Sequence, residues 1–114
     1  MKVIKIAQVP SPTVSVDATV FDAVRIMEQA RGGACAVVDG DKLAGIFSER
    51  DVMKRVVRTR LNPEQTHVSE VMTTSLETIQ TDTDSTEALE LMVSKHIRHL
   101  PVVNPDGSLA GLLS

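Results

Sequence analysis

The sequence predicts an α/β (α+β) fold made of two copies of a β-α-β-β-α unit, packed with pseudo-twofold symmetry. Three observations lead to this fold class. The chain repeats itself at a fixed spacing, each copy carries one helical apolar stripe among short strand-like runs, and 114 residues are enough for one compact domain. Since each copy alone would expose an apolar sheet face, we expect the copies to pack together and to leave a ligand cleft between them.

The internal repeat relates Asp22–Ser48 to Glu87–Ser114. The spacing is 65 residues as far as the turn and 66 beyond it, where one residue is inserted. The matched positions are Ala23 with Ala88, Met27 with Met92, Val37-Val38 with Val102-Val103, Leu43-Ala44-Gly45 with Leu109-Ala110-Gly111, and Ser48 with Ser114. Because strands and turns match as well as helices, two similar amphipathic helices are not a sufficient explanation.

The first copy is expected to occupy residues 9–60. A short strand at Thr13–Val16 precedes a helix at Val20–Ala30, with Thr19 as N-cap and Asp22 as its capping-box partner. Gly32-Gly33 should end this helix. Two paired strands, ACAVV and LAGIFS, follow around the turn DGDK, and Ser48 and Asp51 open a second helix, ERDVMKRVVRTR. The inward face of the first helix should consist of Val20, Ala23, Val24, Met27 and Ala30.

Residues 61–75 are expected to form a linker with one helical turn at Val68–Met72, and residues 76–114 the second copy. Its helix is capped near Asp84 and should turn Ala88, Leu89, Met92 and Val93 inward. The strands LPVV and LAGLLS follow, separated by the turn NPDG. This copy stops at Ser114 without the aspartate and the helix that follow Ser48, so we expect a truncation at its last helix.

Composition narrows the classes of function. The net charge is only −3 and two phenylalanines are the only aromatic residues, which argues against nucleic-acid binding. No apolar run approaches the ~20 residues of a membrane helix, and the N-terminus does not resemble a signal peptide. The single cysteine, Cys35, cannot form an internal disulfide, which favours a cytoplasmic location.

No residue pattern typical of catalysis is present, so we do not expect an enzyme. The chain has no G-x-x-x-x-G-K-[ST] phosphate loop, no G-x-S-x-G elbow and no G-x-G-x-x-G fingerprint. His67, His96 and His99 lack metal-ligand spacing with one another or with Cys35, so no metal site is expected.

Four stretches together resemble a pair of cystathionine β-synthase (CBS) domains, the arrangement called a Bateman module. They are TVSVDATVFDAVRIM, GIFSERD, VSEVMTT and HIRHLPVVNPDGSLAGLLS, and the resemblance extends from about Val9 onward. GIFSERD together with RHLPVV resembles the small stand-alone bacterial CBS pairs more than the modules embedded in enzymes. The resemblance implies a sensor that needs no cofactor and binds AMP, ADP or ATP, with NAD(H) and S-adenosylmethionine as secondary candidates. It also implies a homodimer and an unknown regulated partner.

The resemblance implies ligand-binding positions as well. Ser48, Arg50 and Asp51 of the first copy, with Arg98 and His99 of the second, would contact ribose and phosphate. An ionised Asp51 only accepts hydrogen bonds, which suits ribose hydroxyls, and Arg98 offers a charged fork to a phosphate. The helix start after Ser48 would offer N–H groups to a phosphate. The adenine would lie against Val14, Cys35, Ala36, Thr78, Ile79, Leu100 and Pro101.

Each of these positions also has a purely structural explanation. Ser48 and Asp51 fit a helix N-cap, and Arg98 and His99 fit a charged helix end. Arg50 fits a solvated helix face, and the adenine positions fit ordinary core packing.

Two hypotheses about function remain. The leading one is a regulatory module that binds an adenosine-containing nucleotide in the cleft between the copies and signals occupancy to a partner. The alternative is a structural dimerisation module with a degenerate site. A homodimer is expected because Ile26 and Leu91 lie outside the main apolar stripes and need cover.

Overall fold

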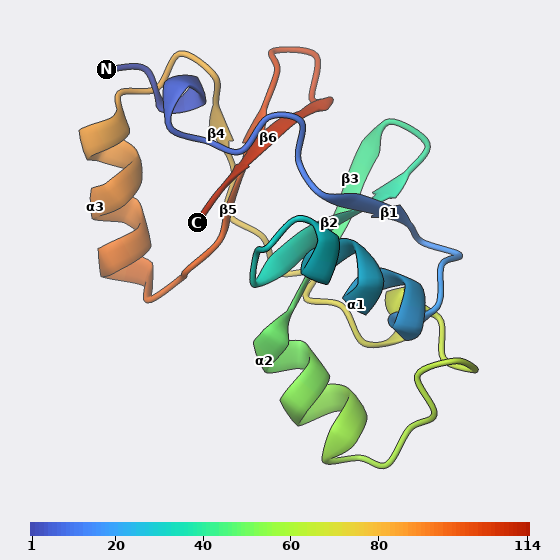
Figure 1. The fold of residues 1–114 in the computed structure, drawn as a ribbon. Coiled ribbons are helices and arrows are strands. Elements are labelled where there is room, and N and C mark those ends of the chain that lie inside the picture. The colour runs from blue at the N-terminus through green and yellow to red at the C-terminus, as the bar shows by residue number, and fades with distance from the viewer. The chain divides into compact units, whose positions relative to one another are not determined.

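The computed structural model describes the whole chain, residues 1–114, as two compact units. One unit is continuous and comprises Pro12–Leu76, whereas the other combines Met1–Ser11 with Glu77–Ser114. Each unit contains a three-stranded sheet and helices (Figure 1). The predicted mixed α+β fold class is confirmed.

The Pro12–Leu76 unit is built on one sheet in which β1 pairs with β2 in parallel and β2 pairs with β3 in antiparallel fashion. A parallel pair needs a crossover connection, and α1 provides it. The elements are β1 (Thr13–Ser15), α1 (Val20–Gln29), β2 (Ala34–Asp39), β3 (Lys42–Ser48), α2 (Glu49–Asp51), the π-helical turn η2 (Val52–Val57) and the 3-10 helix η3 (Val68–Glu70).

The second unit repeats this arrangement, so the predicted internal repeat is confirmed. Its sheet has the order β4-β5-β6, again with one parallel and one antiparallel pairing. Both sheets shift register at equivalent points, between Val37 and Val38 and between Val102 and Val103. The elements are the 3-10 helix η1 (Val3–Lys5), β4 (Ile79–Gln80), α3 (Ser85–Lys95), β5 (Leu100–Val103) and β6 (Leu109–Leu113).

The start of α1 is as predicted, but its end is not. Oγ1 of Thr19 accepts a 3.1 Å hydrogen bond from the N–H of Asp22, and the carboxylate of Asp22 accepts one of 3.4 Å from the N–H of Thr19. The helix ends before the glycines, because Arg31 takes the left-handed conformation, with a φ of 54°. His96 has the same φ of 54° after α3, so the two helices end alike.

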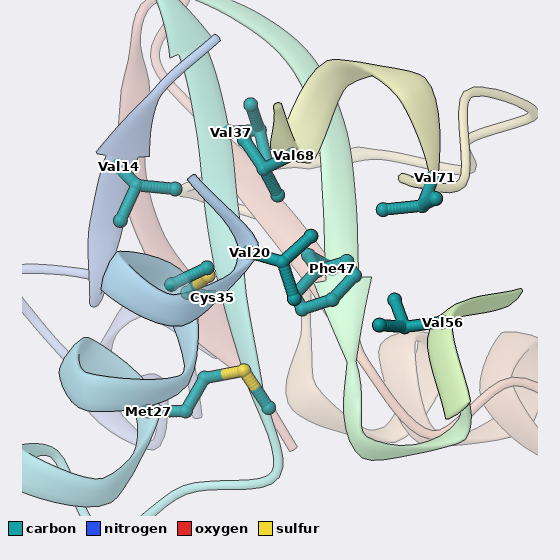
Figure 2. Close-up of a cluster of buried hydrophobic side chains, with 10 residues drawn as sticks. Val14, Val20, Met27, Cys35, Val37, Phe47, Val56, Val68 and Val71 are labelled. Atoms are coloured by element: carbon teal, nitrogen blue, oxygen red, sulfur yellow. The ribbon is translucent and has the colours of Figure 1, made fainter. Parts of the chain in front are cut away.

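Each unit has its own apolar core. Side chains from α1, β2 and β3 meet those of η2 and η3 in the Pro12–Leu76 unit (Figure 2). Val20, Ala23 and Met27 of the predicted inward helix face are buried there and Val24 packs against them, whereas Ala30 is half-buried and outside this core. The other buried members of this core are Val14, Cys35, Val37, Phe47, Val56, Val68 and Val71, and the second core contains Val3, Ala88, Leu100, Val102 and Leu113.

The inward face of α3 is narrower than predicted. Ala88 is buried, but Leu89 and Val93 are 49% and 75% exposed, so the prediction that these two residues lie inward was wrong. The strands of this unit are short, so their sheet covers only part of the apolar stripe of α3. Ile26 and Leu91, which were expected to need outside cover, instead pack against their own cores.

The segment between the repeats is part of the first compact unit. Residues 61–75, which the sequence predicts as a linker, lie within Pro12–Leu76. Val68 is fully buried in the core of that unit. The backbone N–H and C=O of Thr73 form hydrogen bonds of 2.8 and 3.0 Å with Ile46 in β3. This segment therefore extends the fold that surrounds the first repeat.

The N-terminal segment, Met1–Ser11, likewise extends the fold that surrounds the second repeat. Val3 is fully buried in the core of the second unit, and Gln8 forms backbone hydrogen bonds of 2.8 and 3.0 Å with Leu112 in β6. Val3 and Val68 are 65 residues apart, the spacing of the repeat itself. The segment that leads into each repeat thus belongs to the compact unit of the other repeat.

Two glycines make room for these segments. A Cβ atom on Gly45 would lie 2.9 Å from the backbone oxygen of Thr73, and one on Gly111 would lie 2.8 Å from that of Gln8. Real Cβ atoms essentially never approach other atoms so closely. The matched Gly45 and Gly111 of the sequence repeat therefore mark the two places where a leading segment crosses a strand.

Candidate functional site

Ser48 and Asp51 lie at the junction where β3 ends and α2 begins, and they form a capping box. The N–H of Asp51 donates to Oγ of Ser48 (3.3 Å), while the N–H and the hydroxyl of Ser48 donate to Oδ2 of Asp51 (3.0 and 3.2 Å). Asp51 is only 5% exposed. The helix-start explanation of this pair is thus correct, and it does not exclude a ligand contact.

Two further side chains meet the other carboxylate oxygen of Asp51. The hydroxyl of Thr73 lies 3.1 Å from Oδ1, and Nε of Arg55 lies 3.5 Å from the same atom. Arg55 also donates a 3.0 Å hydrogen bond to the backbone oxygen of Met72. These contacts give hydrogen-bonding partners to an oxygen that burial removes from water. Sequence reasoning missed Thr73 and Arg55, although the spacing from Asp51 to Arg55 is that of an i,i+4 ion pair.

The helix start offers less to a phosphate than the sequence suggested. The N–H of Glu49 donates to the backbone oxygen of Gly33 (2.9 Å), and the N–H of Asp51 is bonded to Ser48. Arg50 is exposed and takes part in none of the ion pairs. Its guanidinium is therefore the available positive charge at this junction.

The other predicted phosphate contacts, Arg98 and His99, precede β5 in the second unit. Arg98 is exposed and takes part in none of the ion pairs. Nδ1 of His99 lies 3.0 Å from Oγ of Ser114, the residue that matches Ser48 in the repeat. The structure thus groups Ser48 with Asp51 in one unit and His99 with Ser114 in the other. That both groups bind one ligand stays a prediction.

The predicted adenine positions divide between core and non-core residues. Val14 and Cys35 belong to the first core. Leu100 belongs to the second core, and Ile79 packs against it. Burial raises the pKa of the Cys35 thiol to about 12, so this side chain is neutral at physiological pH. Ordinary packing accounts for these four residues, and their contact with adenine stays a prediction.

The remaining adenine positions lie outside the two apolar cores. Ala36 and Pro101 are buried, and each directly follows a core residue of its strand, Cys35 or Leu100. Because successive side chains of a strand point to opposite faces, these two residues lie on the sheet face away from their own core. Thr78 is exposed. Packing therefore also accounts for Ala36 and Pro101, only Thr78 is exposed, and the contact of all three with adenine stays a prediction.

No three histidine, cysteine, aspartate or glutamate side chains are grouped closely enough to hold a metal ion. None of the helices has both the length and the apolar character that crossing a membrane requires.

The family comparison agrees with this architecture. The CBS domain model matches residues 3–58 and 68–114, so the chain belongs to the CBS domain family and carries two such domains. The resemblance seen in the sequence, to a tandem CBS pair, is confirmed. CBS pairs are in general regulatory, ligand-binding modules and typically not enzymes.

Related sequences occur within longer proteins. The CBS domain-containing protein CBSCBSPB3 of Arabidopsis thaliana is 42% identical over 102 residues, which are 89% of this chain and 18% of that protein. The uncharacterized protein MK0525 of Methanopyrus kandleri is 34% identical over 104 residues, 91% of this chain and 52% of that protein. The chain thus spans only part of the length of these relatives.

Solved structures confirm the fold. A CBS-domain protein from Burkholderia ambifaria, provisionally assigned to signal transduction, has a TM-score of 0.87 and 32% identity, covering 100% of this chain and 88% of that one. The CBS domain protein TA0289 of Thermoplasma acidophilum, of unknown function, has a TM-score of 0.88 and 27% identity, covering 100% of this chain and 65% of that one.

Proposed function

We propose that this chain is a regulatory module that binds an adenosine-containing nucleotide and signals occupancy to a partner protein. The observation that carries the proposal is the buried Asp51 carboxylate, held at a strand-to-helix junction of a CBS domain. A cytoplasmic location is part of the proposal and rests on the single cysteine.

The chemistry of the site suits a ribose. Asp51 has oxygens with about four acceptor directions, and Ser48 and Thr73 use most of them. Arg55 is the weakest of the partners, because its Nε is 3.5 Å away and its side chain is 51% exposed. Ribose hydroxyls would take the place of Arg55, while Arg50, Arg98 and a protonated His99 would meet phosphate charge.

Calorimetric titration of AMP and adenosine separates these roles. Asp51→Ala should weaken both ligands by about 10- to 150-fold, the value of a hydrogen bond to a charged group. Arg98→Ala should weaken AMP and spare adenosine, because only AMP carries a phosphate. Asp82→Ala, at an exposed acid outside the site, is the matched control. Unchanged AMP affinity in Asp51→Ala would contradict the proposal.

One observation favours the alternative, a dimerisation module with a degenerate site. The Asp51 carboxylate is already satisfied within its own unit. A thermal-shift panel of AMP, ADP, ATP, NAD, NADH and S-adenosylmethionine distinguishes the two functions. A ligand at roughly 100 times its Kd should add about 2.7 kcal/mol to the free energy of unfolding. No response to any of these compounds would favour the degenerate site.

A further inference from the structure

Thr73 is the one contact of the Asp51 carboxylate that comes from far along the chain. The two residues are separated by 22 positions, and the hydroxyl of Thr73 lies 3.1 Å from Oδ1 and 3.4 Å from Oδ2. The backbone of Thr73 is itself fixed, because its N–H and C=O are both hydrogen-bonded to Ile46 in β3. The hydroxyl is thus held in place relative to the strand that ends at Ser48.

The contacts of the two carboxylate oxygens differ in kind. Oδ2 accepts the N–H of Ser48, which is part of the capping box, and the hydroxyl of Ser48 at 3.2 Å, while Thr73 lies at the longer distance of 3.4 Å. Oδ1 is met by Thr73 and, at the longer distance of 3.5 Å, by Arg55. The capping box alone leaves Oδ1 without a short hydrogen bond, so Thr73 fixes the plane of the carboxylate.

We infer that Thr73 is a positioning residue for the nucleotide site. Its hydroxyl holds Oδ1 of Asp51 so that the remaining acceptor directions face the ribose hydroxyls, in the place now taken by the exposed Arg55. The inference rests on the proposed function and adds to it a residue of the segment between the repeats. It also makes ribose recognition by the first repeat dependent on that segment.

The test compares adenosine with 2′,3′-dideoxyadenosine, which lacks the 2′ and 3′ hydroxyls and keeps the 5′ hydroxyl. The intact protein should bind adenosine at least about 10-fold more tightly, the value of one to two hydrogen bonds to a charged acceptor. Thr73→Val removes the hydroxyl and keeps the shape of the side chain. It should bring the ratio of the two affinities close to one, with little change in the affinity for dideoxyadenosine.

Two variants serve as controls. Thr73→Ser keeps a hydroxyl and should keep the ratio within about threefold of the intact protein, whereas Thr74→Val alters the exposed neighbouring threonine and should leave it unchanged. If Thr73→Val fails to fold, Thr73→Ala carries the same test. A purely structural role of Thr73 would weaken both ligands equally and leave the ratio intact, which would overturn the inference.

The outcomes also separate this inference from the proposed function. An intact protein that binds no adenosine compound, or binds both nucleosides equally, would remove the ribose contact of Asp51 and with it the role of Thr73. An intact protein that prefers adenosine, together with a Thr73→Val variant that keeps the preference, would overturn only the role of Thr73.

Discussion

Asp51 is a buried carboxylate whose hydrogen bonds tie three segments of one unit together. Asp51→Ala should lower the free energy of unfolding by about 1–3 kcal/mol, because it leaves the Ser48 N–H and the Thr73 hydroxyl without their acceptor. A simple helix cap would account for only the lower end of this range, ~1 kcal/mol. Urea denaturation measures the change. Asp51→Asn keeps an acceptor oxygen and should lose less, and equal losses in both variants would contradict this account.

The buried thiol of Cys35 should make the free energy of unfolding decrease at alkaline pH. Its pKa in the folded protein is raised to about 12 from an ordinary value of 9.0, so the folded state keeps the proton that the unfolded state loses. The stabilisation is complete below pH 9.0 and falls as the pH rises toward 12. At about pH 10 the free energy of unfolding should be lower by about 1.4 kcal/mol than at about pH 8.

Comparison with Cys35→Ala isolates this effect. The variant loses packing at every pH, but its change between about pH 8 and about pH 10 should be smaller than that of the intact protein by the same ~1.4 kcal/mol. Equal pH dependence of the two proteins in urea denaturation would show that the thiol does not contribute.

Of the side-chain contacts of Asp51, the one within the capping box was predicted from the sequence and the distant one with Thr73 was not. The S-x-x-D pattern of Ser48 and Asp51 predicted a capping box, because the contact spans one helical turn. Thr73 approaches Asp51 only through the hydrogen bonds that attach its segment to β3. No local pattern reports such a contact.

At the scale of elements, the segment of residues 61–75 crosses β3 at Gly45, and a substitution at this glycine tests that packing. Gly45→Ala should lower the free energy of unfolding by about 1–3 kcal/mol, because the new methyl group collides with the backbone oxygen of Thr73 and the Met72 side chain. Thermal or urea denaturation measures it. Lys42→Ala, at the exposed start of the same strand, should change stability by less than about 0.5 kcal/mol. A fully stable Gly45→Ala would show that the segment does not pack as described.

Periodicity predicted which elements exist better than it predicted how they are covered. The helices at Val20–Gln29 and Ser85–Lys95 and the paired strands β2-β3 and β5-β6 lie where the sequence placed them, apart from the end of α1. The exposure of Leu89 and Val93 was not predictable, because an apolar stripe does not reveal how much sheet lies beneath it. The roles of η1 and η3 had a signal, the 65-residue spacing between Val3 and Val68, which extends the repeat upstream.

At the scale of the whole molecule, we propose a homodimer that buries the exposed face of α3. Leu89 and Val93 lie on that face beside a hollow of about 370 Å³, which Thr86, Glu90 and Ser94 also line. Isolated apolar residues are common on surfaces, but a second copy would remove both from water. Light scattering at micromolar concentration should show a dimer, and Val93→Glu should shift it toward monomer.

A control variant makes the dimer test specific. Asp41→Lys changes an exposed charge in the turn between β2 and β3, on another element, and should leave the dimer intact. A clean monomer for the unsubstituted protein at micromolar concentration would reject the homodimer. Dissociation by both variants would indicate that charge, and not the apolar face of α3, controls assembly.

The reciprocal placement of the leading segments has a consequence for how such a chain can be divided. A single repeat with its own leader, about Met1–Gln65, would carry Val3 and Gln8 in a segment whose site in the present chain lies on the other repeat. Two such half-length chains would complete each other by exchanging leaders, as in domain swapping. The compact unit is instead Pro12–Leu76, which keeps Val68 and Thr73 with their partners.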